Sequence, residues 1–376
     1  MAGVELVEEA QAREDEEDLQ VGGFQAFLHD KSKVASALLV FVLLLVAIYV
    51  LFPKVVGLEG TFDKIASATW YWIVIAVGFN VAAFAAYVAL FRGILGGVED
   101  SVLRDRLDVR ASYQITMAGL AATRIFSAAG AGGIAVTYWA LRKAGMPRRR
   151  AACRMVAFLV LMYSVYLLAL VVFGVLLRAN VLPGDNPVGG TIVPAAVAGG
   201  LMALFLLVAL IPQDVERRLM RLGGRRFAGV AARLAAGPAT VATGVRTAID
   251  FVSHPRRGAP AVLGALGFWA ANIGVLWASF EAFGGDVAFA VLVQGFFVGM
   301  AANLIPSPAG GVGSVDAGMI AAFVLFGIPT EEIFPAVLTY RVIAFWLPIP
   351  PGIVAYFQLR STVADWEAAS VSKVKA

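Results

Sequence analysis

The sequence predicts an all-α, polytopic membrane protein with about six full spans and two re-entrant helical hairpins of opposite orientation. Two observations define the class. Hydrophobic residues make up 60% of the chain and charged residues 15%, and the mean hydropathy is +0.81, far above that of soluble domains. Several apolar runs are also long enough to cross about 30 Å of hydrocarbon.

Six apolar segments are expected to cross the membrane as helices, since each supplies about 20 residues. They are 34–52, 70–92, 154–178, 191–212, 260–283 and 333–358. Lys and Arg gather near Lys31, between Arg142 and Arg154, and across Arg217 to Arg257, whereas the alternate loops are nearly free of them. The positive-inside rule therefore predicts cytoplasmic N- and C-termini. The acidic N-terminus and the lack of a clear cleavage site indicate that the first span stays as an anchor.

Two remaining apolar stretches, about 111–141 and 287–327, are not expected to be simple spans. Treated as single crossings, they would not keep the basic loops on the cytoplasmic side. The basic residues that follow the first stretch would lie outside if it crossed once, and about 31 residues are too few for two crossings. A hairpin that enters and leaves on the cytoplasmic side satisfies both constraints. The three spans that follow then place the second hairpin on the extracellular side.

Both hairpins contain a similar Gly-rich break. The segments 122–133 and 302–313 share six of twelve residues without gaps, and each is followed by a Gly-x-Pro, at Gly145–Pro147 and Gly327–Pro329. Paired interrupted segments in two halves of a membrane protein indicate a transport site. Exposed N–H groups at such tips would attract an anion such as a lipid phosphate, although close helix packing through small residues is the alternative.

Intramembrane charges strengthen the hypothesis of a binding site, because each is expensive to insert and calls for a partner. Asp316 and Arg341 form the obvious candidate pair, which could instead be a purely structural link between the second hairpin and the last helix. The complete set of candidate substrate-binding residues is Arg124, Ser127, Gly130, Gly132, Gly133, Asn303, Pro306, Ser307, Gly310, Gly311, Gly313, Asp316, Tyr340 and Arg341.

The flanking segments have simpler interpretations. Residues 1–30 are expected to form an acidic, disordered cytoplasmic tail, and 361–376 a polar tail. Between them, 31–360 forms the transmembrane domain. Within it, the basic segment 213–258 suits a helix in the headgroup region, and an ordinary positive-inside linker explains it equally well.

Several kinds of chemistry have little support in the sequence. A single cysteine, Cys153, excludes an intrachain disulfide. The two histidines, His29 and His254, are isolated, so no metal site is expected. We expect no cofactor, no catalytic constellation and no nucleic-acid partner. A membrane lipid is the expected partner, and a homo-oligomer or a cell-envelope enzyme partner is left open.

The second half carries a specific resemblance. The run Ile305–Ala317, followed by Gly327–Pro329, Tyr340–Arg341, Trp346–Pro348 and Gly352, resembles the lysylphosphatidylglycerol synthase transmembrane (flippase-like) family. Its hallmark is a Pro-rich turn, Gly-Gly-hydrophobic-Gly and an acidic residue before Ala, then a Tyr-Arg pair. Here Asp316 replaces the usual Glu, and Gly130–Ala135 lacks the Glu of the family's first repeat.

The resemblance implies a stand-alone flippase-like domain in the bacterial cytoplasmic membrane. It would bind and translocate an anionic phospholipid or a polyprenyl-linked lipid between leaflets. The stretch after the last span is too short for an aminoacyl-transfer module, so synthase activity is not expected. A secondary transporter of a small anion and a non-transporting scaffold for a cell-envelope enzyme are the alternatives.

Overall fold

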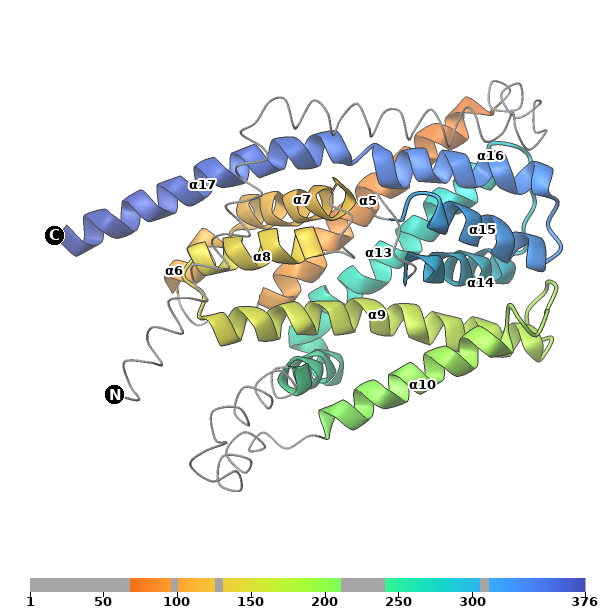
Figure 1. The fold of residues 1–376 in the computed structure, drawn as a ribbon, viewed down its shortest axis with the longest axis horizontal. Coiled ribbons are helices and arrows are strands. Elements are labelled where there is room, and N and C mark those ends of the chain that lie inside the picture. Colours follow the sequence, from red (N-terminus) through yellow and green to blue (C-terminus); the bar gives the residue numbers. More distant parts are fainter. Residues whose placement is uncertain (1–67, 96–100, 126–130, 211–240, 305–310, 376) are drawn as a thin grey trace. The chain divides into compact units, whose positions relative to one another are not determined.

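Helices make up nearly all of the chain that the structure describes, and no strand occurs in that part. The computed structural model describes residues 68–95, 101–125, 131–210, 241–304 and 311–375 (Figure 1). The tail 1–30, the first expected span, the last two residues of the span expected at 191–212 and residues 213–240 of the basic segment lie outside the described residues. In chain order the helices are α5 (Trp70–Leu95), α6 (Ser101–Arg106), α7 (Val109–Ile125), α8 (Ala131–Lys143), α9 (Arg148–Arg178), α10 (Ile192–Ala209), α13 (Pro255–Glu281), α14 (Phe289–Met300), the 3₁₀ turn η2 (Ala301–Leu304), α15 (Ser314–Leu325), α16 (Thr330–Arg341), the π-helical turn η3 (Val342–Trp346) and α17 (Ile349–Lys375).

Five helical segments in the described part are long and apolar enough to cross a membrane. They are Trp70–Leu95, Arg148–Arg178, Ile192–Ala209, Arg256–Glu281 and Thr330–Ala369. Each overlaps one of the spans expected after residue 60, because a sustained apolar run of this length leaves few other stable conformations in hydrocarbon. The fold is therefore that of a polytopic helical membrane protein.

The helices α5 and α13 form an antiparallel pair in close contact. The backbone N–H of Thr69, just before α5, donates to the carbonyl of Ala282 just after α13, at 2.9 Å. Near the opposite end of the pair, a Cβ added to Gly93 would lie 2.7 Å from the Cα of Ala261. A small residue at this contact allows the two backbones to approach, as is typical of membrane helices.

Four shorter helices form two packed pairs. The first pair is α7 and α8, where a Cβ added to Gly119 would lie 3.4 Å from the carbonyl oxygen of Gly133. The second pair is α14 and α15, where a Cβ added to Gly299 would lie 2.6 Å from the Cα of Met319. At 1.5 Å per residue, α7 is about 25 Å long and the other three are about 18–20 Å. All four helices are therefore shorter than the hydrocarbon thickness of about 30 Å.

The two helix pairs approach from opposite ends of α9. The pair α7–α8 is joined directly to the start of α9 through Gly145–Pro147. The pair α14–α15 lies instead at the loop that follows α9, where a Cβ on Gly190 would lie 2.8 Å from the Phe326 ring. Figure 1 shows the two pairs extending toward one another along α9.

The last helical segment differs from the single span expected at 333–358. It is divided into α16, η3 and α17, and α17 continues to Lys375. The stretch from Ser361 is therefore helical rather than a separate tail. It packs along α7, where Thr362 Oγ1 donates to Gln114 Oε1 at 2.9 Å. It also contacts α6, since Arg106 Nη2 donates to the Trp366 carbonyl at 3.1 Å.

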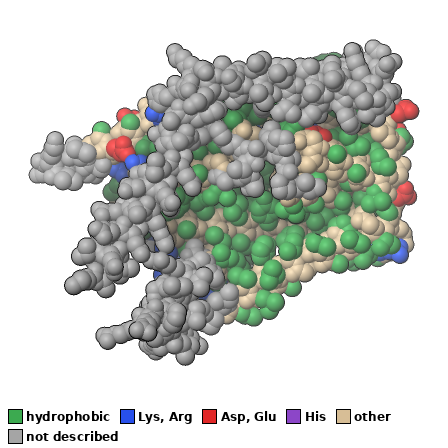
Figure 2. Space-filling model, in the orientation of Figure 1, with side chains coloured by type: hydrophobic (Ala, Val, Ile, Leu, Met, Phe, Trp, Pro, Cys, Tyr) green, Lys and Arg blue, Asp and Glu red, His purple; other side chains and the backbone are tan. Residues whose placement is uncertain are grey.

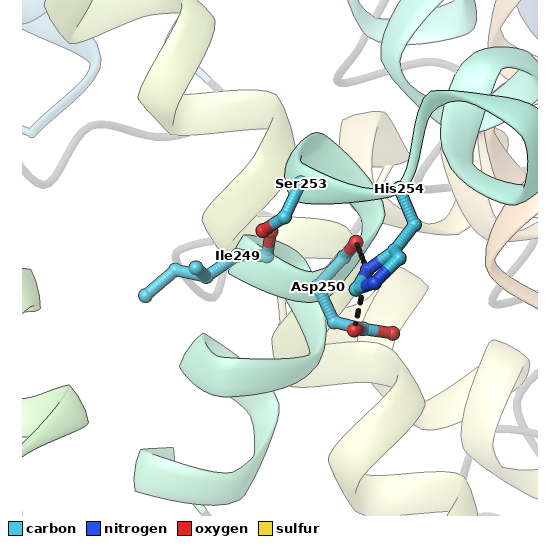
Figure 3. A network of polar contacts seen from close by, with 4 residues as sticks. All are labelled: Ile249, Asp250, Ser253 and His254. Carbon is cyan, nitrogen blue, oxygen red and sulfur yellow. Dashed lines mark hydrogen bonds and ion pairs between the residues drawn. The ribbon is translucent and has the colours of Figure 1, made fainter.

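A local polar network lies at the end of the helical residues 241–253, just before α13 begins (Figure 3). His254 Nδ1 lies 2.9 Å from Asp250 Oδ1, one turn earlier, and the Ser253 hydroxyl donates to a backbone carbonyl at 2.6 Å. Pro255 then begins α13, where its missing N–H is tolerated. The contacts are exposed and local, so they mark the boundary between two helices.

Candidate functional site

Two glycines with positive φ shape the start of α15. Gly311 has φ +93° and Gly313 has φ +85°, a left-handed conformation that glycine adopts without steric cost. The Gly313 N–H donates to Asp316 Oδ2 at 2.8 Å, so Asp316 closes the first turn of the helix in the manner of a capping box. The other carboxylate oxygen of Asp316 remains for a second partner.

That partner is Arg341, as the sequence predicts. Arg341 Nε lies 2.7 Å from Asp316 Oδ1, and the two side chains are 5% and 13% exposed. The Nε–H does not point along this line, so the contact is an ion pair rather than an aligned hydrogen bond. Arg341 Nη2 also donates to the Gly311 carbonyl at 3.2 Å. The ion pair therefore links the start of α15 to the end of α16.

Next to Arg341 the helix loses its regular hydrogen bonding. The Leu347 N–H donates to the Val342 carbonyl at 2.9 Å, an i→i+5 bond that defines the π-helical turn η3. Pro348 has no N–H, so the Ala344 carbonyl lacks its usual donor four residues ahead. A free carbonyl inside a membrane protein needs a replacement donor.

Arg124, at the end of α7, supplies this donor. Its Nη2 donates to the Ala344 carbonyl at 2.9 Å, and its Nη1 donates to the Phe345 carbonyl at 2.7 Å. The planar guanidinium is suited to such a pair of neighbouring oxygens. Arg124 thus connects the end of α7 to the break between α16 and α17.

The ring of Phe345 lies close to both arginines. Its centroid is 4.4 Å from the guanidinium carbon of Arg341 and 5.1 Å from that of Arg124, distances typical of cation–π contacts. We call Arg124, Asp316, Arg341 and Phe345 the arginine cluster. It contains two cations and one anion, and residues 126–130 and 305–310, which complete the two Gly-rich breaks, contain no charged residue. The cluster therefore has an excess positive charge.

Other candidate residues have different places. Tyr340 is 4% exposed, and its ring packs edge-on against Phe296 at 5.7 Å. Asn303 is exposed in η2, with Oδ1 2.7 Å from where a Cβ on Gly311 would lie. Gly132 and Gly133 lie in the first turn of α8, where Gly133 faces Gly119 and allows α7 and α8 to approach. The predicted residues outside the described part are Ser127, Gly130, Pro306, Ser307 and Gly310.

Sequence reasoning identified both arginines but missed Phe345 and the carbonyl partners of Arg124. A signal was present in the sequence. Pro348, Pro350 and Pro351 lie within about one helical turn, and none of them has a backbone N–H to donate. No metal-ligand cluster accompanies the site, since no group of three or more His, Cys, Asp or Glu with suitable placement occurs within the described ranges.

The fold and the cluster define a multi-pass membrane protein in which charged side chains meet at broken helices. A family model described as the lysylphosphatidylglycerol synthase TM region matches residues 34–352. The chain belongs to this family. The matched region is a transmembrane region rather than a catalytic domain, and it associates the chain with lipid handling in membranes.

A second comparison points in the same direction. The chain is similar to a UPF0104 membrane protein from Methanothermobacter thermautotrophicus, with 29% identity over 97 residues. The match covers 26% of this chain and 29% of that relative. The similarity therefore supports the assignment to a class of membrane proteins.

Proposed function

We propose that the protein binds an anionic lipid through its phosphate at the arginine cluster and translocates it between leaflets. The observation that carries the proposal is the placement of Arg124 and Arg341 around Phe345 with Asp316 as the single carboxylate. An excess cation in apolar surroundings is unfavourable unless an anion neutralises it. A lipid phosphate supplies that charge, and Arg binds phosphate through paired hydrogen bonds.

The cluster has donors to spare for such a ligand. Arg124 uses two of its five N–H groups on Ala344 and Phe345, and no partner for the other three occurs among the described residues. The positive end of the helix dipole at the start of α15 lies beside Asp316 and Arg341. Helix starts that point toward an anionic substrate are a recurring device in transporters built from broken helices.

The distribution of charge supports the orientation in the membrane. Lys143 and Arg148–Arg150 lie at the end of the helices where α9 begins. Among the described residues at the other end, the only Lys or Arg is Arg178, the last residue of α9. Figure 2 shows hydrophobic side chains over the middle of the visible face and charged side chains at its two ends. The end with α6 and the start of α9 is then cytoplasmic.

In this orientation α7–α8 and α14–α15 are re-entrant hairpins from opposite sides, related as an inverted repeat. Their short lengths and opposite approach along α9 support this arrangement. Arg124 belongs to the first hairpin, and Arg341 is paired to the second through Asp316. A headgroup at the cluster would thus contact elements from both sides of the membrane.

The test is lipid translocation in reconstituted vesicles. Fluorescent phosphatidylglycerol in phosphatidylcholine vesicles is exposed to membrane-impermeant dithionite. The wild-type protein should make inner-leaflet fluorophore accessible, whereas Arg341→Ala and Arg124→Ala should match protein-free vesicles. Arg178→Ala, a charge removed at the far end of α9, is the matched control and should match the wild type.

Each alternative function predicts a different result when lipid translocation is measured together with phosphate uptake and co-purification. Uptake of soluble phosphate without lipid translocation would indicate an anion transporter and contradict the proposal. Neither activity, together with stable co-purification of an envelope enzyme, would indicate a scaffold and also contradict it.

A further inference from the structure

A side cavity of about 370 Å³ lies between α5, α7, α8 and α9. Its lining follows single helix faces, with Thr116, Gly119 and Thr123 on α7 at i, i+3 and i+7 spacing. Its volume is within the range of about 300–1,000 Å³ that is common for ligand sites. The cavity is separate from the arginine cluster, although Thr123 is the sequence neighbour of Arg124.

The wall of the side cavity suits hydrocarbon rather than a polar headgroup. The Thr116 hydroxyl donates to the Ser112 carbonyl at 2.8 Å, and the Thr123 hydroxyl donates to the Gly119 carbonyl at 3.0 Å. Because both hydrogens are bonded within α7, these side chains have no hydrogen left to donate to a ligand. Aromatic and aliphatic side chains such as Phe158 complete the lining.

One end of the cavity carries a cation. Arg154 lines it, held by a hydrogen bond from Nη1 to the Ile94 carbonyl at 2.6 Å and by the Phe251 ring at 5.7 Å. Arg154 forms no ion pair with a carboxylate of the described residues. It lies one to two turns into α9, just after the basic run Arg148–Arg150.

The cavity has a suitable depth and an opening. Its lining on α9 extends from Arg154 to Tyr163, which is about 13 Å along the helix and close to half of the roughly 30 Å hydrocarbon thickness. Ile134 on α8 and Tyr163 on α9 line it while 45% and 47% exposed. A chain could therefore enter sideways between α8 and α9.

We propose that the side cavity holds one hydrocarbon chain of a phosphate-bearing lipid of the cytoplasmic leaflet, with its phosphate on Arg154. Thr123, which lines the cavity near the end of α7, is the sequence neighbour of Arg124, so a lipid held here would be in the loading position for the arginine cluster. Only this last step rests on the proposed function, because the cavity can bind a lipid whether or not translocation follows.

The experiment is photolabelling in phosphatidylcholine vesicles. The probes are phosphatidylglycerol and diacylglycerol, each with a diazirine in one acyl chain, and labelled peptides are mapped by mass spectrometry. In the wild type, peptides containing Thr116–Thr123 and Phe158–Tyr163 should be labelled more strongly by phosphatidylglycerol than by diacylglycerol. The lipid-facing helix α10 should show no such preference.

Two pairs of variants make the test specific. Leu159→Trp with Ile134→Trp fills the cavity and should abolish its labelling, whereas Leu168→Trp, on an exposed position of the same helix, should not. Arg154→Ala should reduce the preference for phosphatidylglycerol by about tenfold, as expected for loss of a charged hydrogen bond. Arg149→Ala should leave it unchanged. Variants are compared only when their thermal midpoint and elution match the wild type.

The outcomes separate the two proposals. Cavity peptides labelled no more than α10 in the wild type, or labelling that survives the cavity-filling variant, would overturn the side-cavity proposal. Specific labelling by a protein that does not translocate lipid would support the cavity and contradict the proposed function. Translocation without cavity labelling would support the proposed function and contradict the side-cavity proposal.

Discussion

Arg124 Nη1 donates a hydrogen bond to the carbonyl oxygen of Phe345 at 2.7 Å, and its guanidinium carbon lies 5.1 Å from the ring of the same residue. One side chain at the end of α7 thus contacts both the backbone and the ring of a residue far along the chain. Because Phe345 also contacts Arg341, it connects the two arginines on which the proposed function depends.

Arg124→Ala should destabilise the fold, because it leaves the Ala344 and Phe345 carbonyls without their donor. Loss of a charged hydrogen bond to a buried group typically costs about 1–3 kcal/mol. Arg124→Lys should restore only part of the lost stability. Its ammonium keeps the charge but lacks the planar fork that donates to both oxygens. Thermal unfolding in detergent measures this. Equal midpoints for the wild type and Arg124→Ala would contradict the assignment.

Asp316 and Arg341 should show strong coupling. Removing either partner leaves an uncompensated buried charge, which typically costs about 3–5 kcal/mol. The double variant Asp316→Asn with Arg341→Gln removes both charges and should be more stable than either single variant. A double-mutant cycle of unfolding free energies measures the coupling. Additive effects would show that the pair is not energetically linked.

Phe345→Leu should keep an apolar side chain but remove the aromatic face between the arginines. A cation–π contact contributes about 0.5–2 kcal/mol, so the midpoint of unfolding should fall, whereas Phe345→Tyr should change it little. Phe357→Leu is the control, because Phe357 is 53% exposed. Equal effects of the two Leu substitutions would contradict a special role for Phe345.

Gly93→Ala and Gly78→Ala, both on α5, should have opposite effects. A Cβ on Gly93 would lie 2.7 Å from the Ala261 Cα, whereas nothing lies within 4 Å of one on Gly78. Overpacking typically costs about 1–3 kcal/mol, and Ala in an open helix position gains up to about 1 kcal/mol over Gly. Thermal unfolding again measures both, and a tolerated Gly93→Ala would contradict the close α5–α13 contact.

The proposed membrane orientation predicts which positions an impermeant thiol reagent reaches in intact cells. In a Cys153→Ala background, Val181→Cys lies in the loop after α9 and should be labelled. Arg149→Cys, at the start of α9, should be labelled only after permeabilisation. The opposite pattern would reverse the orientation.

Much of this architecture follows from the sequence because hydrocarbon tolerates few alternatives to helices. The apolar runs near 70–92 and 154–178 coincide with α5 and α9 for that reason. The Asp316–Arg341 pair was also predictable, since two intramembrane charges near one another have strong reason to pair. Local composition is sufficient for inferences of this kind.

The rest depends on contacts between distant segments. Nothing near Arg124 in the chain indicates that its partners are carbonyls some 220 residues later. The helical continuation of α17 beyond Ser361 is stabilised by packing on α7, through Thr362 and Gln114, which hydropathy does not report. The proline run after Phe345 was visible, but the donor that compensates for it could not be identified without the fold.

The central claim is that the arginine cluster binds a lipid phosphate, and native mass spectrometry of gently extracted protein tests it most directly. The wild type and Arg178→Ala should retain a phosphate-bearing lipid at the same occupancy. The double variant Arg124→Lys with Arg341→Lys, which keeps the charge but loses the planar donors, should retain about tenfold less, as expected from loss of paired hydrogen bonds to phosphate. Equal retention by a correctly folded double variant would contradict the claim.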